Sequence, residues 1–543
     1  MRRLDRGDLL LAGAGAMILG AAALYASLVW SWLSDRPASS AVPAPVTAKV
    51  DTGVLAAARQ SYRDAFLDAR SWLRLSEALA RAGRPIDSFY VLREARAFFS
   101  EDAFRKAHAS VIQRRDPAAL DDDAGPEQEP LLKTRLQSDL DNPGLLLTLA
   151  RLQSRAGRST EANRSLDLGL TAHPQNGALL LAKGQLSEST DPLAAIPFYA
   201  RAAHASPDRY EGRFALERLG QLAGTPELGP RGESARLARE ALEELRRAHP
   251  GDAAIFATLG LALGARGDMT TMRALALEAG RKEADNPGVA MLEGALALND
   301  RETDLAIQRF TTAWEHNPED VYSAEKLALI YSQQRGDEEA ALPYRIALFR
   351  RDPARRQGGE LLDVLIRRTL DARRKALLKN VTVEGLGRFL QSEDASLRAE
   401  ACERAAAFKD PRWIEVVAEL LDDDAEIVRR NADYALYQLG KLYPDALQVR
   451  RDAWLTSERP LLRARALNLF ADLWPQETLP LALRALQDPN PALRYLTKTL
   501  VLDRYYRGVP AAQRGAAESM AQEKNPLMLE RYDDDKRRAR AQP

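Results

Sequence analysis

A chain of 543 residues is too long for one hydrophobic core, so several domains or a long solenoid are expected. Hydrophobic residues make up 45% and charged residues 28% of the chain, a composition that excludes wholesale disorder. Lys and Arg total 77, as do Asp and Glu, so the net charge gives no indication of a nucleic-acid partner. One cysteine, Cys402, is too few for an intrachain disulfide framework.

Residues 9–34 contain no charged side chain and are numerous enough to cross a bilayer as a helix. Arg2, Arg3 and Arg6 precede this stretch, so we expect residues 1–8 in the cytoplasm and the rest of the chain on the periplasmic side of the inner membrane. The alternative is a signal peptide cleaved near Ser39 and Ala41, but the apolar core of a signal peptide is normally shorter.

Residues 35–52 contain three prolines among alanines and serines, and we interpret them as a linker. A helical pattern follows over residues 53–120, where Trp72, Leu75 and Leu79 fall on one face. A stretch rich in Asp, Glu, Gly and Pro, residues 121–130, then predicts a loop. We therefore expect a first helical segment, separated from the main array that follows it.

Residues 131–355 repeat a two-helix pattern, shown most clearly by Phe256, Leu259, Gly260 and Gly267. Prolines that end the second helices recur at intervals of 31 to 43 residues, at positions 174, 207, 250, 287, 318 and 353. The widest interval contains an insertion at residues 224–232. This pattern resembles the tetratricopeptide repeat (TPR), in which small residues let paired helices approach and large residues fill the space between them.

The resemblance to TPR proteins implies a partner-binding groove along the first helices of the units. Its expected lining residues are Thr258, Leu261, Met291, Leu292, Lys326 and Leu329. Most of these side chains are apolar, so the resemblance implies an amphipathic or apolar partner helix rather than an acidic tail.

Residues 356–380 form a predicted basic linking helix after a break at Gly358-Gly359. Its cationic side chains are Arg367, Arg368, Arg373, Arg374, Lys375 and Lys379. Such a run is most often a solvated helix face. The alternatives are contact with an acidic partner or with phospholipid headgroups.

One short phrase recurs four times in residues 381–505: a leucine, then an arginine eight residues later. The arginines are Arg398, Arg429, Arg463 and Arg494, and an acidic or polar turn lies between each leucine and its arginine. The phrase resembles short HEAT-like repeats. That resemblance implies that the arginines begin second helices and set the repeat register by pairing with turn acids such as Asp394 and Asp424. Residues 506–543 are expected to hold a short helix near 511–522 and a loose tail.

No catalytic motif is evident in the sequence. The five histidines fall in different repeats, so we expect them to be separated in space and not to share a metal ion. Cys402 follows Ala401 inside a predicted helix and is interpreted as a buried structural thiol. We therefore expect no catalytic residue, cofactor or metal site, and we do not expect an enzyme.

These patterns predict an all-α chain: a transmembrane helix, then a TPR-like solenoid that continues into a HEAT-like solenoid. The leading hypothesis is a single-pass, membrane-anchored bacterial scaffold whose protein partners are subunits of a membrane or envelope complex, with the HEAT-like array held away from the membrane. One alternative is an enzyme or lyase-like cofactor-maturation subunit, with a deep pocket where the two arrays meet. Another is a membrane-surface or nucleic-acid binder that uses the basic helix, which the balanced charge disfavours.

Overall fold

The structure, a computed structural model, describes residues 52–111, 129–207, 209–225, 232–318 and 320–541. The predicted membrane span at 9–34, the linker up to residue 51 and most of the predicted acidic loop lie outside these residues. Among the helices that are described, none has both the length and the apolar character needed to cross a membrane.

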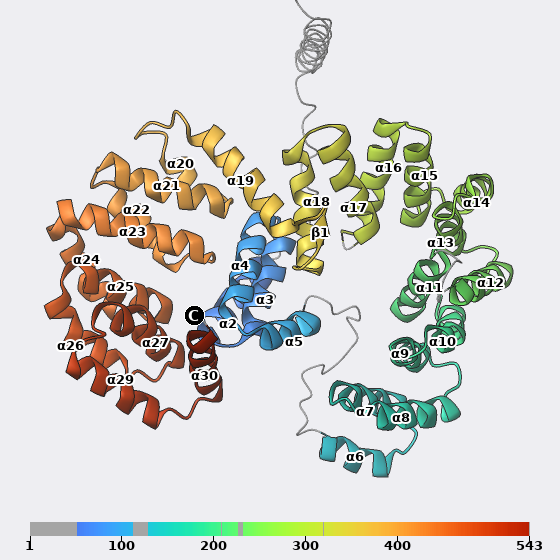
Figure 1. The fold of residues 1–543 in the computed structure, drawn as a ribbon, viewed down its shortest axis with the longest axis horizontal. Coiled ribbons are helices and arrows are strands. Elements are labelled where there is room, and N and C mark those ends of the chain that lie inside the picture. The colour runs from blue at the N-terminus through green and yellow to red at the C-terminus, as the bar shows by residue number, and fades with distance from the viewer. Residues whose placement is uncertain (1–51, 112–128, 208, 226–231, 319, 542–543) are drawn as a thin grey trace, which may run out of the picture. The chain divides into compact units, whose positions relative to one another are not determined.

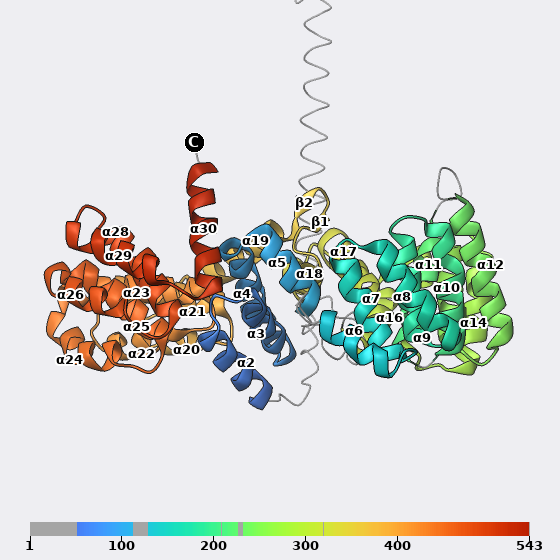
Figure 2. The ribbon, with the colours of Figure 1, turned by 90° about the horizontal axis from the view of Figure 1, so that it is seen from below.

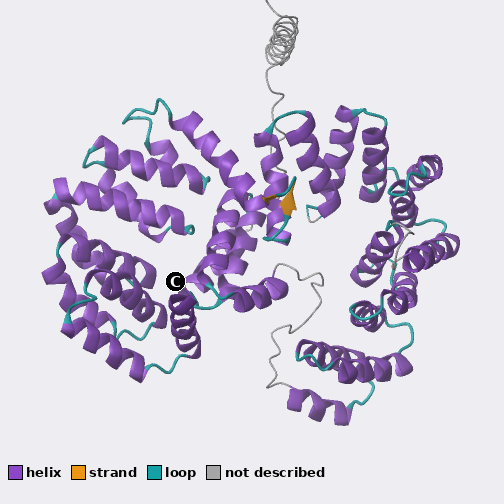
Figure 3. Cartoon of the chain, in the orientation of Figure 1, coloured by secondary structure: helices purple, strands orange, loops and turns teal. Residues whose placement is uncertain are grey.

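The described part of the chain is α-helical apart from one short antiparallel ribbon (Figure 3). Four helices form the N-terminal group: α2 Thr52–Asp64, α3 Ala69–Arg81, α4 Pro85–Phe98 and α5 Glu101–Val111. The fold is thus all-α and solenoid-like, as the sequence predicts.

The second group consists of antiparallel helix pairs in the TPR-like region. Its elements are α6 Glu129–Ser138, α7 Pro143–Arg155, α8 Ser159–Ala172, α9 Gly177–Glu188, α10 Pro192–Ala205, α11 Tyr210–Ala223, α12 Gly232–Ala248, α13 Ala253–Gly264, α14 Met269–Lys282, α15 Pro287–Asn299, α16 Thr303–His316, α17 Val321–Leu329 with the π-helical turn η2 Ile330–Gln334, and α18 Glu338–Arg351. Successive first helices, such as α11, α13 and α15, contact one another, and α11 and α13 lie side by side in Figure 1.

Local chemistry explains where these helices begin. Asn142, Asn176, Asp252, Asn286 and Asp320 precede first helices, and each side chain accepts a backbone N–H of the first turn. Such caps satisfy donors that have no partner inside the helix, and each contributes about 1 kcal/mol. The recurrent Asp and Asn therefore fix the start of every unit from α7 to α17 except α11, which follows Arg209.

A ribbon and one helix connect the two arrays. β1 Arg356–Gln357 pairs with β2 Glu360–Leu361, and the turn between them is Gly358-Gly359 with φ of 59° and 87°. Only glycine adopts two such values readily, which suits this tight turn. Helix α19, Leu362–Leu378, follows and contacts both α18 and α21.

The HEAT-like region follows α19. Its elements are α20 Gly387–Leu390, α21 Ala395–Phe408, α22 Trp413–Glu419 with the 3-10 turn η3 Leu420–Asp422, α23 Glu426–Leu442, α24 Pro444–Leu455, α25 Pro460–Leu473, α26 Pro475–Ala485, α27 Pro491–Leu496 with the π-helical turn η4 Thr497–Leu502, α28 Asp503–Tyr505, α29 Pro510–Gln522 and α30 Pro526–Ala541. The second helices α21, α23, α25 and α27 contact one another in series.

The C-terminal segment differs from the sequence prediction. Helix α29 covers the predicted short helix, but residues 526–541, expected as a loose tail, form helix α30. Met528 and Tyr532 of α30 are buried in the same hydrophobic core as Phe98 and Tyr495. The prediction was wrong because the polar composition of this segment concealed three residues spaced for burial on one helix face, Met528, Arg531 and Tyr532.

Candidate functional site

Helix α4 is the element around which the N-terminal and HEAT-like helices meet (Figures 1 and 2). It contacts α18, α21 and α23, and four consecutive side chains, Phe89 to Leu92, are all buried. Four consecutive positions occupy nearly a full turn of the helix, so this part of α4 is covered on every side. The expectation that the TPR-like array separates the HEAT-like array from the linker is therefore wrong, because α2, the first described helix after the linker, binds the turn at 422–424 directly.

Two carboxylates on α4 cap two successive HEAT-like helices. The carboxylate of Asp87 accepts the backbone N–H of Ala395, the first residue of α21, at 2.8 Å. That of Glu94 accepts the N–H groups of Glu426 and Ile427, which begin α23, at 2.7 and 2.9 Å. Seven residues rise about 10.5 Å along a helix, close to the distance of about 8–10 Å between packed helices. Helix α4 therefore presents one carboxylate to each of these two repeats.

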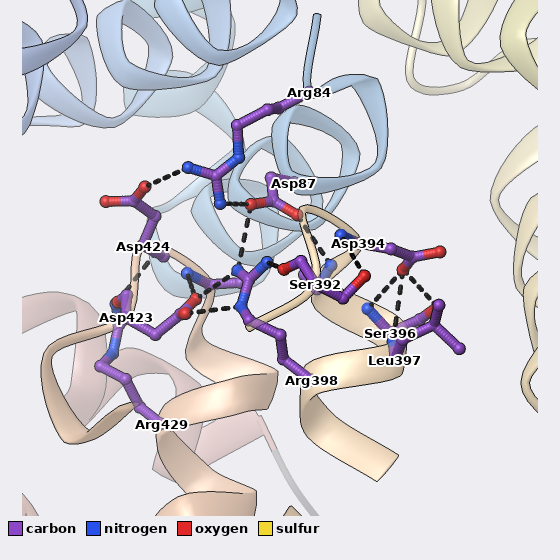
Figure 4. Close-up of polar contacts among 12 residues, drawn as sticks. Arg84, Asp87, Ser392, Asp394, Ser396, Leu397, Arg398, Asp423, Asp424 and Arg429 are labelled. Atoms are coloured by element: carbon purple, nitrogen blue, oxygen red, sulfur yellow. Dashed lines mark hydrogen bonds and ion pairs between the residues drawn. The ribbon is translucent and has the colours of Figure 1, made fainter. Parts of the chain in front are cut away.

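Arg398 connects α4 to the following repeat turn (Figure 4). Its guanidinium donates to both carboxylate oxygens of Asp423 at 2.8 and 2.9 Å and to Asp87 at 3.0 Å. A further N–H reaches the carbonyl of Ser392 at 2.7 Å. Arg84 also pairs with Asp87, so this buried carboxylate lies between two guanidinium groups. Such charge-assisted bonds in a buried setting fix geometry more strongly than exposed pairs do.

Arg429 makes the equivalent contacts one repeat later and is almost fully buried. It donates to the Glu426 carboxylate at 3.0 Å, to the carbonyl of Asp424 at 3.0 Å and to the Tyr62 hydroxyl at 2.9 Å. Tyr62 belongs to α2. The arginine therefore joins the N-terminal helices to the turn before α23.

The acidic turn at residues 422–424 also receives arginines from α2. Arg59 donates to Asp424 at 2.7 Å and Arg63 to Asp422 at 2.7 Å. The three aspartates are thus bound by cationic side chains from two parts of the chain. Within the described residues no group of three or more His, Cys, Asp or Glu side chains has the arrangement of a metal site.

Burial shifts the pKa of the carboxylates on α4. Desolvation raises the pKa of Glu94 to about 7, although Arg429 and the two backbone N–H groups act in the opposite direction. Desolvation also raises the pKa of Asp87 to about 6, opposed by Arg398 and Arg84. Asp87 is still ionised at neutral pH and paired, whereas Glu94 is close to its midpoint.

The four repeat arginines occupy equivalent positions, each as the fourth residue of α21, α23, α25 or α27. Arg463 pairs with Asp488 at 3.1 Å, and Arg494 donates to the Asp488 carbonyl at 2.7 Å and to Glu523 at 2.8 Å. The expected pairing of Arg398 with Asp394 is wrong. Asp394 instead accepts the N–H of Ser396 at 2.8 Å and caps its own helix.

Sequence reasoning missed the α4 carboxylates and the α2 arginines. The sequence period of a repeat array indicates the helices of the array, but not which other segment of the chain packs on them. One signal was present in α4, where the consecutive apolar residues Phe89 to Leu92 occupy nearly a full turn of the helix and so require partners beyond one neighbouring helix.

Five of the six predicted groove residues are half-buried on first helices: Thr258 and Leu261 on α13, Met291 on α15, and Lys326 and Leu329 on α17. Leu292 is fully buried, which excludes it from a groove surface. A β-carbon at Gly260 would lie only 2.9 Å from the methyl groups of Leu292. Leu292 therefore fills the space that this glycine leaves between α13 and α15.

The basic linking helix α19 is largely neutralised by the chain itself. Arg367 pairs with Asp363 at 3.2 Å, Arg368 with Glu360 at 2.6 Å and Arg374 with Asp371 at 3.0 Å. Arg373 lies 3.3 Å from both Glu339 and Asp394. These pairs reduce the charge that the helix could offer to an acidic partner or a lipid surface.

Cys402, the single cysteine of the chain, lies on α21 of the HEAT-like half and is not available as a surface thiol. Cys402 is fully buried, and desolvation raises the pKa of its thiol above the ordinary value. Two surface hollows, of about 500 and 550 Å³, lie on the TPR-like half. The larger is lined by the turn before α16 and by η2.

Comparison with known proteins agrees with the repeat architecture. Residues 383–469 match the profile of HEAT repeats. No curated protein shows a significant match to the chain. The chain is therefore a helical-repeat protein with a HEAT-repeat segment, and the match does not extend over enough of it to define a family for the whole.

Solved helical-repeat proteins show a distant likeness. The human IFIT1 dimer with m7Gppp-AAAA is 14% identical, over 81% of this chain and 96% of that one, with a TM-score of 0.27. The Naa15/Naa10 structure bound to HypK-THB is 13% identical, over 90% of this chain and 78% of that one, with a TM-score of 0.21. The ligands named there, m7Gppp-AAAA and HypK-THB, are ligands of those proteins.

Proposed function

We propose that this chain is a membrane-anchored scaffold that binds a protein partner along the first helices of its TPR-like array. The observation that carries the proposal is that the chain's own N-terminal helices bind one array and leave the first-helix surface of the other array uncovered. The starts of HEAT-like helices α21 and α23 are bound by Asp87 and Glu94 of the chain's own α4, while the first-helix side chains of α13, α15 and α17 remain half-buried. Extended helical-repeat surfaces of this kind typically bind helices or extended segments.

The chemistry of that surface supports an apolar or amphipathic partner helix. Leu261, Met291 and Leu329 are half-buried and supply apolar contact area on three successive units. Lys326 lies over the Tyr322 ring, with its ammonium 5.2 Å from the ring centroid, and adds one cation at the edge. We propose that the partner is a subunit of a membrane or envelope complex, because the uncharged stretch at 9–34 suits a single-pass anchor.

The anchor would also be connected to the HEAT-like array. Helix α2 begins at Thr52, eighteen residues after the uncharged stretch ends, and its Arg59 and Arg63 bind the turn at 422–424. In the proposed arrangement the N-terminus is cytoplasmic, the repeats are periplasmic, and the HEAT-like half is tied to the residues nearest the anchor.

Site-specific photocrosslinking in native membranes tests the proposal. A photoreactive residue would replace Leu261 or Leu329 on first helices, and Leu277 would serve as the matched control. Leu277 is 67% exposed on the second helix α14. We expect one discrete protein adduct from the first two positions and none from the control. Equal labelling at all three positions, or no adduct from the first two, would contradict a first-helix groove.

A further inference from the structure

Two histidines from different TPR-like units meet at the ends of second helices. His204 lies in the last turn of α10, and His249 directly follows α12. Nε2 of His249 lies 2.9 Å from Nδ1 of His204, and the ring centroids are 4.8 Å apart. The expectation that the histidines are separated in space is wrong for this pair. Helices α10 and α12 pack against each other, so side chains that end successive units become neighbours.

The separation of the two ring nitrogens matches a chelating pair. Imidazole nitrogens bind divalent transition metals at about 2.0–2.1 Å. Two nitrogens 2.9 Å apart then subtend an angle of roughly 90° at the metal. This angle suits neighbouring positions of a square-planar or octahedral ion better than the wider angle of a tetrahedral one.

The surroundings also favour a cation. Both histidines lie at helix C-termini, where the backbone carbonyls carry partial negative charge. His204 is exposed and His249 is half-buried, and the hydrogen bond between the rings lies at the surface, where an ion and its water ligands can approach. In the hydrogen-bonded pair one ring donates its N–H to the other. Metal binding would release that proton, and both rings would turn so that each nitrogen lone pair faces an ion lying to one side of the line between the two nitrogens.

We propose that His204 and His249 form a two-histidine site for a late divalent transition ion, with Cu²⁺ preferred over Ni²⁺ and Zn²⁺. The preference follows from the angle and from the general order of metal affinities. Among the described residues no third His, Cys, Asp or Glu joins the pair, so water or a partner's donor group completes the coordination. The ion would cross-link two successive TPR-like units, because His204 belongs to the α10 unit and His249 to the α12 unit.

The test uses the full chain after removal of metal by a chelator, with Cu²⁺ alone as the probe. Calorimetry gives the affinity, and electron paramagnetic resonance reports the number of nitrogen ligands. The variants are His204→Ala, His249→Ala and the size-conserving His249→Asn. His173→Ala is the matched control. His173 also follows a second helix, α8, but its ring contacts the backbone carbonyl of Asp141 at 2.9 Å instead of another ring.

We expect the unaltered chain to bind one Cu²⁺ with a two-nitrogen signal. Each variant at His204 or His249 should weaken binding at least tenfold and lose that signal, and the control should bind as the unaltered chain does. Unchanged affinity in the His204 and His249 variants would overturn the proposal. An equal loss in His173→Ala would also overturn it, because exposed histidines in general would then account for the binding.

Discussion

Arg301 has a left-handed backbone conformation, which glycine adopts in other turns of the TPR-like array. Its φ is 65°, and Gly157, Gly267 and Gly336 have positive φ at the corresponding places after first helices. A β-carbon in this region costs about 1–2 kcal/mol, partly offset by the greater unfolded-state freedom of glycine. We predict that Arg301→Gly stabilises the α15–α16 unit by about 0.5–1 kcal/mol. Hydrogen exchange in these helices measures the change.

The opposite substitution serves as the control. Gly267→Ala places a β-carbon at φ of 89° and should reduce protection in α13 and α14. If Arg301→Gly lowered protection in α15 and α16, its guanidinium would be contributing more than the backbone conformation costs.

Glu94 makes the stability of the folded chain depend on pH, and the direction of the dependence follows from its pKa. Its pKa in the folded chain is about 7, above the ordinary value, so the folded state binds more protons than the unfolded state between about pH 4.5 and 7. The stability that Glu94 contributes is therefore complete below this window and is lost as pH rises through it. The loss is of order 3 kcal/mol.

Glu94→Gln removes this titration. We predict that the thermal midpoint of the variant, relative to the unaltered chain, rises as the pH increases from 5 to 7.5. A matched variant, Glu518→Gln, changes an exposed glutamate on α29 and should show no such trend. A difference that stayed constant with pH would show that Glu94 titrates in its ordinary range.

At the scale of elements, the repeat arginines fall into two classes. Arg398 joins α21 both to α4 and to the turn before α23 and is buried, whereas Arg463 pairs with Asp488 at 3.1 Å and is partly exposed. Removing one member of a buried pair leaves an uncompensated charge and costs about 3–5 kcal/mol, but a partly exposed pair contributes about 1 kcal/mol or less.

We therefore predict that Arg398→Ala lowers protection from hydrogen exchange in both α4 and α21. Arg463→Ala should affect only α25 and its immediate neighbours, and to a smaller extent. Similar losses in the two variants would mean that the arginines act only within their repeats, as the sequence pattern alone suggests.

The sequence predicted the helices and turns better than it predicted which helices pack together. Prolines and glycines are local signals, and they correctly indicated paired helices and a break at Gly358-Gly359, where the structure has the turn of a short β-ribbon. The docking of α4 on α21 and α23 joins residues more than 300 positions apart, and no local signal specifies such a pairing. The buried position of Leu292 was missed for a related reason, since it depends on the space at Gly260 in the preceding unit.

In the whole molecule, helices from both ends of the described chain contribute to the same hydrophobic core. Arg531 of α30 stacks on Phe98 of α4, with its guanidinium carbon 4.1 Å from the ring centroid, and Phe98 packs edge-to-face against Tyr495. Helix α4 thus contacts both the beginning and the end of the HEAT-like region. The N-terminal helices thus pack on the HEAT-like half, although the TPR-like array separates the two in sequence, and they also contact α18, where Arg350 donates to Glu77 at 2.5 Å.

Cleavage of the chain between α5 and α6 tests the docking of the N-terminal helices. A protease site would be inserted within residues 112–128 of the full chain, and the cleaved protein would be passed over a column that retains a C-terminal tag. We expect the fragment containing α2–α5 to stay bound at moderate salt. We also expect release of that fragment when Asp87→Ala and Glu94→Ala are combined with Arg59→Ala. Immediate separation of the two fragments without these substitutions would show that α4 is not docked on the HEAT-like helices in solution.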